Sequence, residues 1–386
     1  MRQKKKWRER SSFSRLGLLF LAVLFGFSVL NLLSRDRVFS EQENRMLEQL
    51  PKVRISGILD GKFMRSFENY QTDQFVFRDT WMQIRTASQR LIGKNESGGV
   101  YLGDGGQLYE KPVKWSDQVW DNLDALKGFA ERHPEVNRYF LLVPDAAAVM
   151  PEGLPPYAPV ENQWEQLSGI RSYLGGAFEE ISVLETLREH REEYLYYRTD
   201  HHWTTLGAYY AFCKAEQVMG LETIGEPEFC ELAGNFEGTL SSKSGYRVPL
   251  DTISVYRPQE EERLAVTYVE EQEKKASLYA SARLDTKDKY GVFLDGNHPV
   301  VEIRTMAESN RKLLLVKDSY ANCFVPFLTG QFREIVLVDP RYYYGELEEL
   351  METHAFTDVL FLYNLNTFLE DNVLHFVLQE TDATEG

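Results

Sequence analysis

The stretch KLLLVKDSYANCF, from Lys312 to Phe324, passes from an unbroken apolar run into a polar turn and then into a second apolar stretch. Four consecutive apolar residues, Leu313 to Val316, are typical of a strand buried on both faces of a parallel sheet. The run breaks at Lys317-Asp318-Ser319, and the helix-compatible stretch YANCFVPFL follows. This order predicts a strand, a turn and a helix, which is the repeating unit of an α/β domain.

The same alternation continues on both sides of this stretch. NRYFLLVPD (137–145), YLYYRTD (194–200) and TDVLFLYN (357–364) predict strands, and residues 119–134 and 205–220 predict helices. Between about 224 and 306 the pattern changes to short strand-like pieces with many turns, including TISVY, ASLYA and YGVFL. We therefore expect an α/β fold with a mostly parallel central sheet and a β-rich insertion at about 224–306.

The amino terminus carries a long apolar run. LGLLFLAVLFGFSVLNLL, from Leu16 to Leu33, contains no charge and is long enough to cross a hydrocarbon core of about 30 Å. Seven basic residues and one acidic residue precede it, which favours a cytoplasmic start and an outside location for the rest of the chain. A cleavable signal peptide is the alternative, but no clear pair of small residues follows the run. The prediction is a single-pass signal anchor in the cell membrane.

These patterns predict four parts of the chain. They are a basic cytoplasmic tail (1–15), a transmembrane signal anchor (16–33), a stalk with amphipathic helices (34–95) and the α/β domain (96–386). The net charge of −16, which is more negative still beyond the tail, argues against a nucleic-acid partner, because a polyanion would be repelled. Three widely separated cysteines do not predict a disulfide framework.

Ser319 is a candidate nucleophile because of its place at a strand-to-helix turn. Such a turn holds a side chain at the carboxyl edge of the sheet, where ligands bind in open α/β folds. The N–H groups at the start of the following helix would face a developing oxyanion. The motif G-x-S-x-G is absent, and a serine in this position also commonly caps a helix, so the turn alone leaves both interpretations open.

A second stretch, TDHHWTTLGAYYAF, supplies a base for such a serine. Asp200 and His202 are two residues apart, so in an extended segment they share a face, and a carboxylate orients and stabilises a histidine that accepts a proton. His201 is then expected to be a packing neighbour, and Trp203 to hold the segment rigid. A zinc site is the alternative reading, but no further metal-ligand motif accompanies the histidines. We expect neither a metal nor another cofactor.

TDHHWTTLGAYYAF together with VKDSYANCF resembles the DHHW proteins of Gram-positive bacteria, relatives of the SGNH-hydrolase-like domains of the alginate O-acetylation machinery. SEQENR (40–45), VYLGDGGQL (100–108) and VDPRY (338–342) support the resemblance, which spans most of residues 39–375. It implies a three-layer SGNH-hydrolase-like fold with Ser319 as nucleophile, His202 as general base and Asp200 as its orienting carboxylate. Lys317 departs from the glycine that is common in GDS elements.

The resemblance implies an extracytoplasmic O-acetyltransferase-like enzyme that modifies a cell-surface or exported polysaccharide through a serine acyl-enzyme. It also implies a partner, a multi-pass membrane O-acyltransferase that supplies the acetyl group. A carbohydrate esterase with the same triad and a non-catalytic glycan-binding or scaffold protein are the alternatives. The oxyanion or substrate candidates are Asn322, Arg341 and Asn364, and the neighbours of the site are His201, Trp203, Asp318 and Tyr320.

Overall fold

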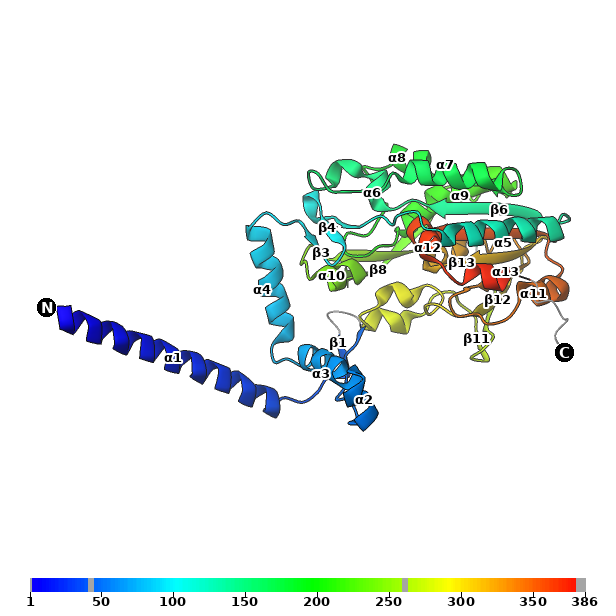
Figure 1. Ribbon diagram of the computed structural model, residues 1–386. Coiled ribbons are helices and arrows are strands. Elements are labelled where there is room, and N and C mark those ends of the chain that lie inside the picture. Colours follow the sequence, from blue (N-terminus) through cyan, green and yellow to red (C-terminus); the bar gives the residue numbers. More distant parts are fainter. Residues whose placement is uncertain (1, 41–44, 259–262, 380–386) are drawn as a thin grey trace. The chain divides into compact units, whose positions relative to one another are not determined.

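The computed structural model describes residues 2–40, 45–258 and 263–379. Residues 41–44 of the SEQENR stretch, 259–262 of the expected insertion and 380–386 lie outside the described residues. The chain divides into two compact units, Met1–Gly93 and Lys94–Gly386 (Figure 1). Each unit has its own set of elements, and the site predicted from the sequence lies in the second.

The first unit is mainly helical. Its long helix α1 (Arg2–Leu33) contains a stretch, Arg15–Leu33, that is long and apolar enough to span a membrane, with a mean hydropathy of 2.4. This finding is consistent with a single-pass anchor. The remaining elements are the paired strands β1 (Phe39–Ser40) and β2 (Arg45–Met46) and the helices α2 (Ile55–Leu59), α3 (Lys62–Asp73) and α4 (Arg78–Leu91).

The second unit is built on an eight-stranded sheet with the order β11-β10-β12-β14-β13-β15-β6-β7. Five neighbouring strands run parallel, namely β14 (Glu334–Val338), β13 (Lys312–Lys317), β15 (Asp358–Asn364), β6 (Asn137–Val143) and β7 (Glu179–Glu180). Three antiparallel strands extend it, namely β12 (Val300–Arg304), β10 (Ala265–Tyr268) and β11 (Glu273–Lys275). The α/β class is confirmed, and the sheet is mixed.

Helices cover both faces of this sheet, because the strands at its centre are apolar on both sides. Leu313 and Leu315 of β13 belong to one buried cluster, and Leu314 and Val316 belong to the other. The first cluster is completed by α6 (Ala146–Val149), α8 (Leu184–Glu189) and α9 (Thr205–Met219). The second is completed by α5 (Gln118–Arg132), α7 (Gln163–Leu174), α11 (Leu347–His354), α12 (Leu365–Glu370) and α13 (Leu374–Leu378).

Two small sheets complete the unit. One is the three-stranded sheet of β3 (Glu96–Ser97), β4 (Val100–Leu102) and β5 (Leu108–Glu110). The other pairs β8 (Glu228–Phe236) with β9 (Asp251–Arg257), and the short helix α10 (Thr239–Ser244) lies between them in the chain. The region expected as an insertion, 224–306, thus contains this pair and the three antiparallel strands of the main sheet. ASLYA and YGVFL are not strands. They pair only through an isolated bridge, Tyr279 to Phe293, and the first part of YGVFL belongs to a 3₁₀ turn, η4 (Lys289–Val292).

Two local predictions were wrong. YANCFVPFL is not an α-helix but two 3₁₀ turns, η5 (Ser319–Cys323) and η6 (Val325–Phe327). Pro326 explains the change, because it lacks an N–H and restricts the residue before it. YLYYRTD forms no strand; only Tyr196 makes a bridge, to Trp203, because the chain turns back on itself around Asp200.

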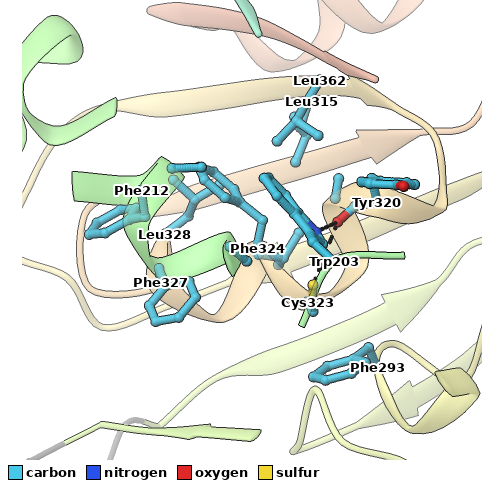
Figure 2. Packing of buried hydrophobic residues seen from close by; sticks show 14 of the residues in the cluster. Trp203, Phe212, Phe293, Leu315, Tyr320, Cys323, Phe324, Phe327, Leu328 and Leu362 are labelled. Atoms are coloured by element: carbon cyan, nitrogen blue, oxygen red, sulfur yellow. Dashed lines mark hydrogen bonds between the residues drawn. The ribbon is translucent and has the colours of Figure 1, made fainter. Parts of the chain in front are cut away.

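Trp203 links the two stretches that the sequence singled out. Its indole is fully buried and donates a hydrogen bond from Nε1 to the backbone oxygen of Tyr320, at 2.9 Å (Figure 2). The ring also stacks on Phe324, with centroids 6.2 Å apart. A buried aromatic ring with a satisfied N–H is a rigid spacer. Trp203 therefore fixes the distance between the segment of His202 and the turn that carries Ser319.

Candidate active site

Ser319 is positioned by the buried carboxylate of Asp318 at the end of β13. One oxygen of Asp318 accepts a hydrogen bond from the backbone N–H of Tyr320 and the other accepts one from the backbone N–H of Asn364, each at 2.9 Å. The ends of β13 and β15 are thereby joined next to the serine. Lys317 is the last residue of β13 and has ordinary strand geometry, so a glycine is not needed there.

The structure brings Asp200, His202 and Ser319 together in one hydrogen-bonded line. The Nδ1 atom of His202 lies 2.5 Å from Oδ1 of Asp200, and its Nε2 atom lies 2.8 Å from Oγ of Ser319. In this arrangement Nδ1–H donates to the carboxylate, which leaves Nε2 free to accept the hydroxyl proton of the serine. The geometry is that of a nucleophile, a base and an orienting carboxylate.

Asp200 is held by groups from a region that the sequence did not mark. Its Oδ2 accepts hydrogen bonds from the backbone N–H of Thr239, at 2.8 Å, and from the hydroxyl of Thr239, at 3.0 Å. Gly238 lies directly against the same carboxylate, where a Cβ atom would come within 2.3 Å of the Cβ of Asp200. No sequence motif in EGTLSSK (237–243) predicts this contact, because α10 and Asp200 are brought together only in the folded chain.

His202 is enclosed by aromatic neighbours. The ring of Tyr290 is stacked on the imidazole, with centroids 3.8 Å apart and an interplanar angle of 11°, and the hydroxyl of Tyr290 donates to the backbone oxygen of Ser319 at 3.0 Å. His201 lies beside it with its Nδ1 2.8 Å from the hydroxyl oxygen of Thr239. The histidine next in sequence is thus a neighbour of the line and not part of it.

Burial and charge set the protonation of the pair. Burial lowers the pKa of His202 to about 4; a positive charge on His201 acts in the same direction, and the carboxylate of Asp200 opposes both. Burial tends to raise the pKa of Asp200, but charge on His201 and His202 and the hydrogen bonds from His202 and Thr239 outweigh it and hold that pKa well below its usual range. At neutral pH the imidazole is therefore uncharged and can accept a proton.

This protonation state predicts the pH dependence of Ser319 reactivity. We expect its modification by phenylmethanesulfonyl fluoride to become faster as pH rises through about 4 and to be level by pH 6, because His202 is a base only when neutral. The measurement is the rate constant of modification between pH 3.5 and 8, with circular dichroism to monitor folding. A midpoint near the ordinary histidine value of 6.5 would contradict the burial of the base.

The same depressed pKa has a consequence for stability. Between pH 6.5 and about 4 the unfolded chain binds a proton at this histidine that the folded chain does not, so His202 lowers stability progressively as pH falls through that window.

A buried charge cluster lies beneath the turn. The ammonium group of Lys317, which is 1% exposed, lies 3.0 Å from Oδ1 of Asn322 and 3.4 Å from the carboxylate of Asp339. Arg341 donates to the same carboxylate at 2.8 Å and 2.6 Å. Burial lowers the pKa of Lys317, and Asp339 opposes this, so the pair offsets part of the cost of a buried charge.

The three oxyanion or substrate candidates differ in whether their side-chain N–H groups already donate hydrogen bonds within the protein. Asn322 donates to Gly296 O at 3.2 Å and Asn297 Oδ1 at 3.1 Å, and Asn364 donates to Asp145 Oδ1 at 2.6 Å. These amides are occupied inside the protein. Arg341 uses Nε and Nη2 for Asp339, its Nη1 has no hydrogen-bond partner within the described part of the chain, and its side chain lines an open cleft.

This cleft has a volume of about 760 Å³, and its lining includes His201, a neighbour of the predicted site. Three residues of its wall contact the site or the charge cluster. Thr239 binds both Asp200 and His201, His201 lies beside His202, and Arg341 binds Asp339. Most of the other lining residues are of polar or charged type, and they include Lys111, Lys114, Lys243, Asn366, Thr367, Glu370 and Asp371. A cleft of this size and polarity can hold part of a hydroxyl-rich ligand.

Asp200, His201 and His202 also pass a distance test for metal ligands, since one atom from each lies within 4.8 Å of the others. The finer geometry does not fit zinc. Two ligands of a tetrahedral zinc ion, bound at about 2.0–2.1 Å, are about 3.3 Å apart. Asp200 Oδ1 and His202 Nδ1 are separated by 2.5 Å, a hydrogen-bond distance, and Nε2 is directed at Ser319. These atoms form a hydrogen-bonded chain whose spacing does not fit a tetrahedral ligand set.

Part of the second unit matches a known protein family. Residues 160–338, which include Asp200, His202 and Ser319, match the family model described as DHHW protein. The resemblance to DHHW proteins is confirmed. A crystal structure of a DHHW family protein from Eubacterium siraeum has 25% sequence identity and a TM-score of 0.64, covering 72% of this chain and 95% of that one. No curated protein matches this chain.

Two structures of Bacillus cereus PatB1 share the fold of this chain. The one with a sulfonyl adduct has 20% identity and a TM-score of 0.59, covering 71% of this chain and 96% of PatB1. The other has 18% identity and a TM-score of 0.58, covering 71% and 98%. At these identities the likeness establishes the fold alone.

Proposed function

We propose that this protein is a membrane-anchored, extracytoplasmic acyltransferase that acetylates a polysaccharide through a covalent intermediate on Ser319, on an SGNH-hydrolase-like fold. The observation that carries the proposal is the continuous line from Asp200 Oδ1 through both nitrogens of His202 to Oγ of Ser319, with distances of 2.5 and 2.8 Å. The open cleft beside it, which is lined by many polar and charged residues, supports a glycan as the acceptor. The apolar stretch Arg15–Leu33 supports the anchor.

In the first half-reaction, Ser319 Oγ attacks the carbonyl carbon of the acyl donor while His202 Nε2 takes the hydroxyl proton. The tetrahedral adduct collapses, the bond to the leaving group breaks, and His202 returns the proton to that group. In the second half-reaction a sugar hydroxyl gives its proton to His202 and attacks the acyl carbon. The bond to Ser319 breaks, and the serine regains its proton. Asp200 stabilises the imidazolium in both halves.

Tyr290 and Arg341 have supporting roles in this scheme. The stacked ring of Tyr290 shields one face of the imidazole from water, and its hydroxyl holds the backbone of Ser319. Arg341 is anchored by Asp339 and lines the cleft, so its remaining nitrogen is available to stabilise negative charge on the acyl oxygen or to bind the substrate. The predicted partner, a multi-pass membrane O-acyltransferase, would deliver the acetyl group.

The test uses 4-nitrophenyl acetate, whose good leaving group removes the need for the natural donor. We expect intact-protein mass spectrometry to find one acetyl group, mapping to the peptide that contains Ser319. The adduct should lose its acetyl group slowly to water and several-fold faster when cello-, chito- or maltotetraose is added, because the cleft holds the acceptor hydroxyl near the acyl carbon.

Two results would favour the alternatives. Fast release to water that none of the oligosaccharides changes would identify an esterase. Folded protein that forms no adduct would identify a non-catalytic glycan-binding or scaffold protein and would overturn the proposal.

A further inference from the structure

The first unit contains a helix with an exposed apolar face. Along α4, Trp81, Ile84 and Leu91 are spaced by three and seven residues and therefore lie on one side of the helix. Their exposed fractions are 43%, 49% and 88%. We call these three residues the α4 face. Exposed side chains of this size leave apolar surface in water, which is unfavourable unless another phase or partner covers it.

The α4 face continues directly from the candidate membrane span. The ring of Phe27 lies 5.8 Å from that of Trp81 and 6.2 Å from that of Phe75, measured between centroids. Phe27 is six residues before Leu33, the end of the span, which corresponds to a depth of about 9 Å at 1.5 Å per residue. If the span crosses the membrane, the rings that touch Phe27 lie at the level of the lipid chains and headgroups.

A polar contact within the span supports the same placement. Asn31 lies in the last turn of α1, and its side-chain oxygen accepts a hydrogen bond from the backbone N–H of Val76 at 2.8 Å. Its amide nitrogen donates to the backbone oxygen of Phe27 at 3.0 Å. A carboxamide near the membrane surface needs such partners, because lipid offers none. The contact ties the residues just before α4 to the outer end of the span.

We propose that the α4 face lies in the outer interface of the lipid bilayer, packed beside the end of the span. Tryptophan and other large apolar side chains are the residues that favour this layer. Arg85, one turn after Trp81, is exposed and can reach lipid phosphates from the same side of the helix. The inference rests on the proposed anchor and not on the chemistry of Ser319.

The consequence concerns where the enzyme acts. Only Ile92 and Gly93 separate α4 from the start of the second unit at Lys94. An interfacial α4 tethers that unit at the membrane surface, whereas a free stalk of residues 34–95 would let it move far from the membrane. The substrate would then be a polymer or an acyl donor that is still close to the bilayer.

The test uses the full chain in nanodiscs of phosphatidylglycerol and phosphatidylethanolamine. The photo-crosslinking residue p-benzoylphenylalanine replaces Trp81 or Ile84. A matched control places it at Gln83, which is exposed and lies about 200° around α4 from Trp81 and about 100° from Ile84. The same residue at Phe25, exposed within the span, verifies insertion of the anchor. We expect lipid adducts at positions 81 and 84 to exceed those at 83 by at least about tenfold.

Equal labelling at the three positions, or adducts joining two protein chains, would overturn the proposal. Acylation of Ser319 by 4-nitrophenyl acetate is measured on the same samples. If the lipid labelling fails while Ser319 is still acylated, the interfacial placement of α4 is wrong. If acylation fails while the labelling is as expected, the proposed chemistry is wrong.

Discussion

Replacing His202 with glutamine is expected to slow acylation of Ser319 by roughly three to six powers of ten, and Ser319→Ala is expected to abolish the adduct. The reason is that Nε2, at 2.8 Å, is the atom placed to take the hydroxyl proton, and a serine without a base is a poor nucleophile at neutral pH. The measurement is the rate of acetyl incorporation from 4-nitrophenyl acetate, followed by mass spectrometry.

His201→Gln is the matched control for this experiment. His201 is adjacent in sequence and in space, but its Nδ1 is directed at Thr239. The control should retain acylation within about tenfold, since it removes no group from the proton path. Equal losses in the two glutamine variants would contradict the assignment of His202 as the base. Glutamine is preferred to alanine because His202 is 5% exposed, and alanine would leave a cavity and an unpaired buried carboxylate.

Gly238→Ala is expected to reduce the same rate by at least about a hundredfold, although the residue takes no part in the chemistry. The added methyl group would lie 2.3 Å from Cβ and 2.5 Å from Oδ2 of Asp200, so the carboxylate or its backbone must move. A displaced Asp200 would no longer hold Nδ1 of His202, and the imidazole would lose its orientation. Overpacking of this kind also costs about 1–3 kcal/mol of folding free energy.

The matched control is Gly234→Ala in the nearby strand β8. A Cβ atom there would have only ordinary contact, with Thr252 Oγ1 at 3.9 Å. The acylation rates of both variants are measured together with their thermal midpoints. If Gly238→Ala acylates as fast as Gly234→Ala, then close packing against Asp200 does not control the position of His202.

Several features could be predicted from the sequence because they depend on local patterns. The apolar runs of β13, β15 and β6 mark strands that are buried on both faces, and the helix α9 ends at Gly220, as its glycine indicates. The pairing of Asp200 with His202 was also predicted, but from the assumption of an extended segment, which is wrong. Residues 199–202 are not extended, and a tight turn brings the carboxylate to both the backbone N–H and Nδ1 of His202.

The sequence by itself determined the α/β class, the apolar span and the residue types of the proposed triad, since hydrophobic periodicity and short motifs are properties of neighbouring residues. Only the tertiary structure decided that His202 lies 2.8 Å from a serine that is 117 positions further along the chain. It also decided that Thr239, Gly238 and Tyr290 hold the two triad members, and that the amides of Asn322 and Asn364 are already occupied. These contacts join segments far apart in the chain, and their distances depend on how the sheet, Trp203 and α10 pack, which no local pattern encodes.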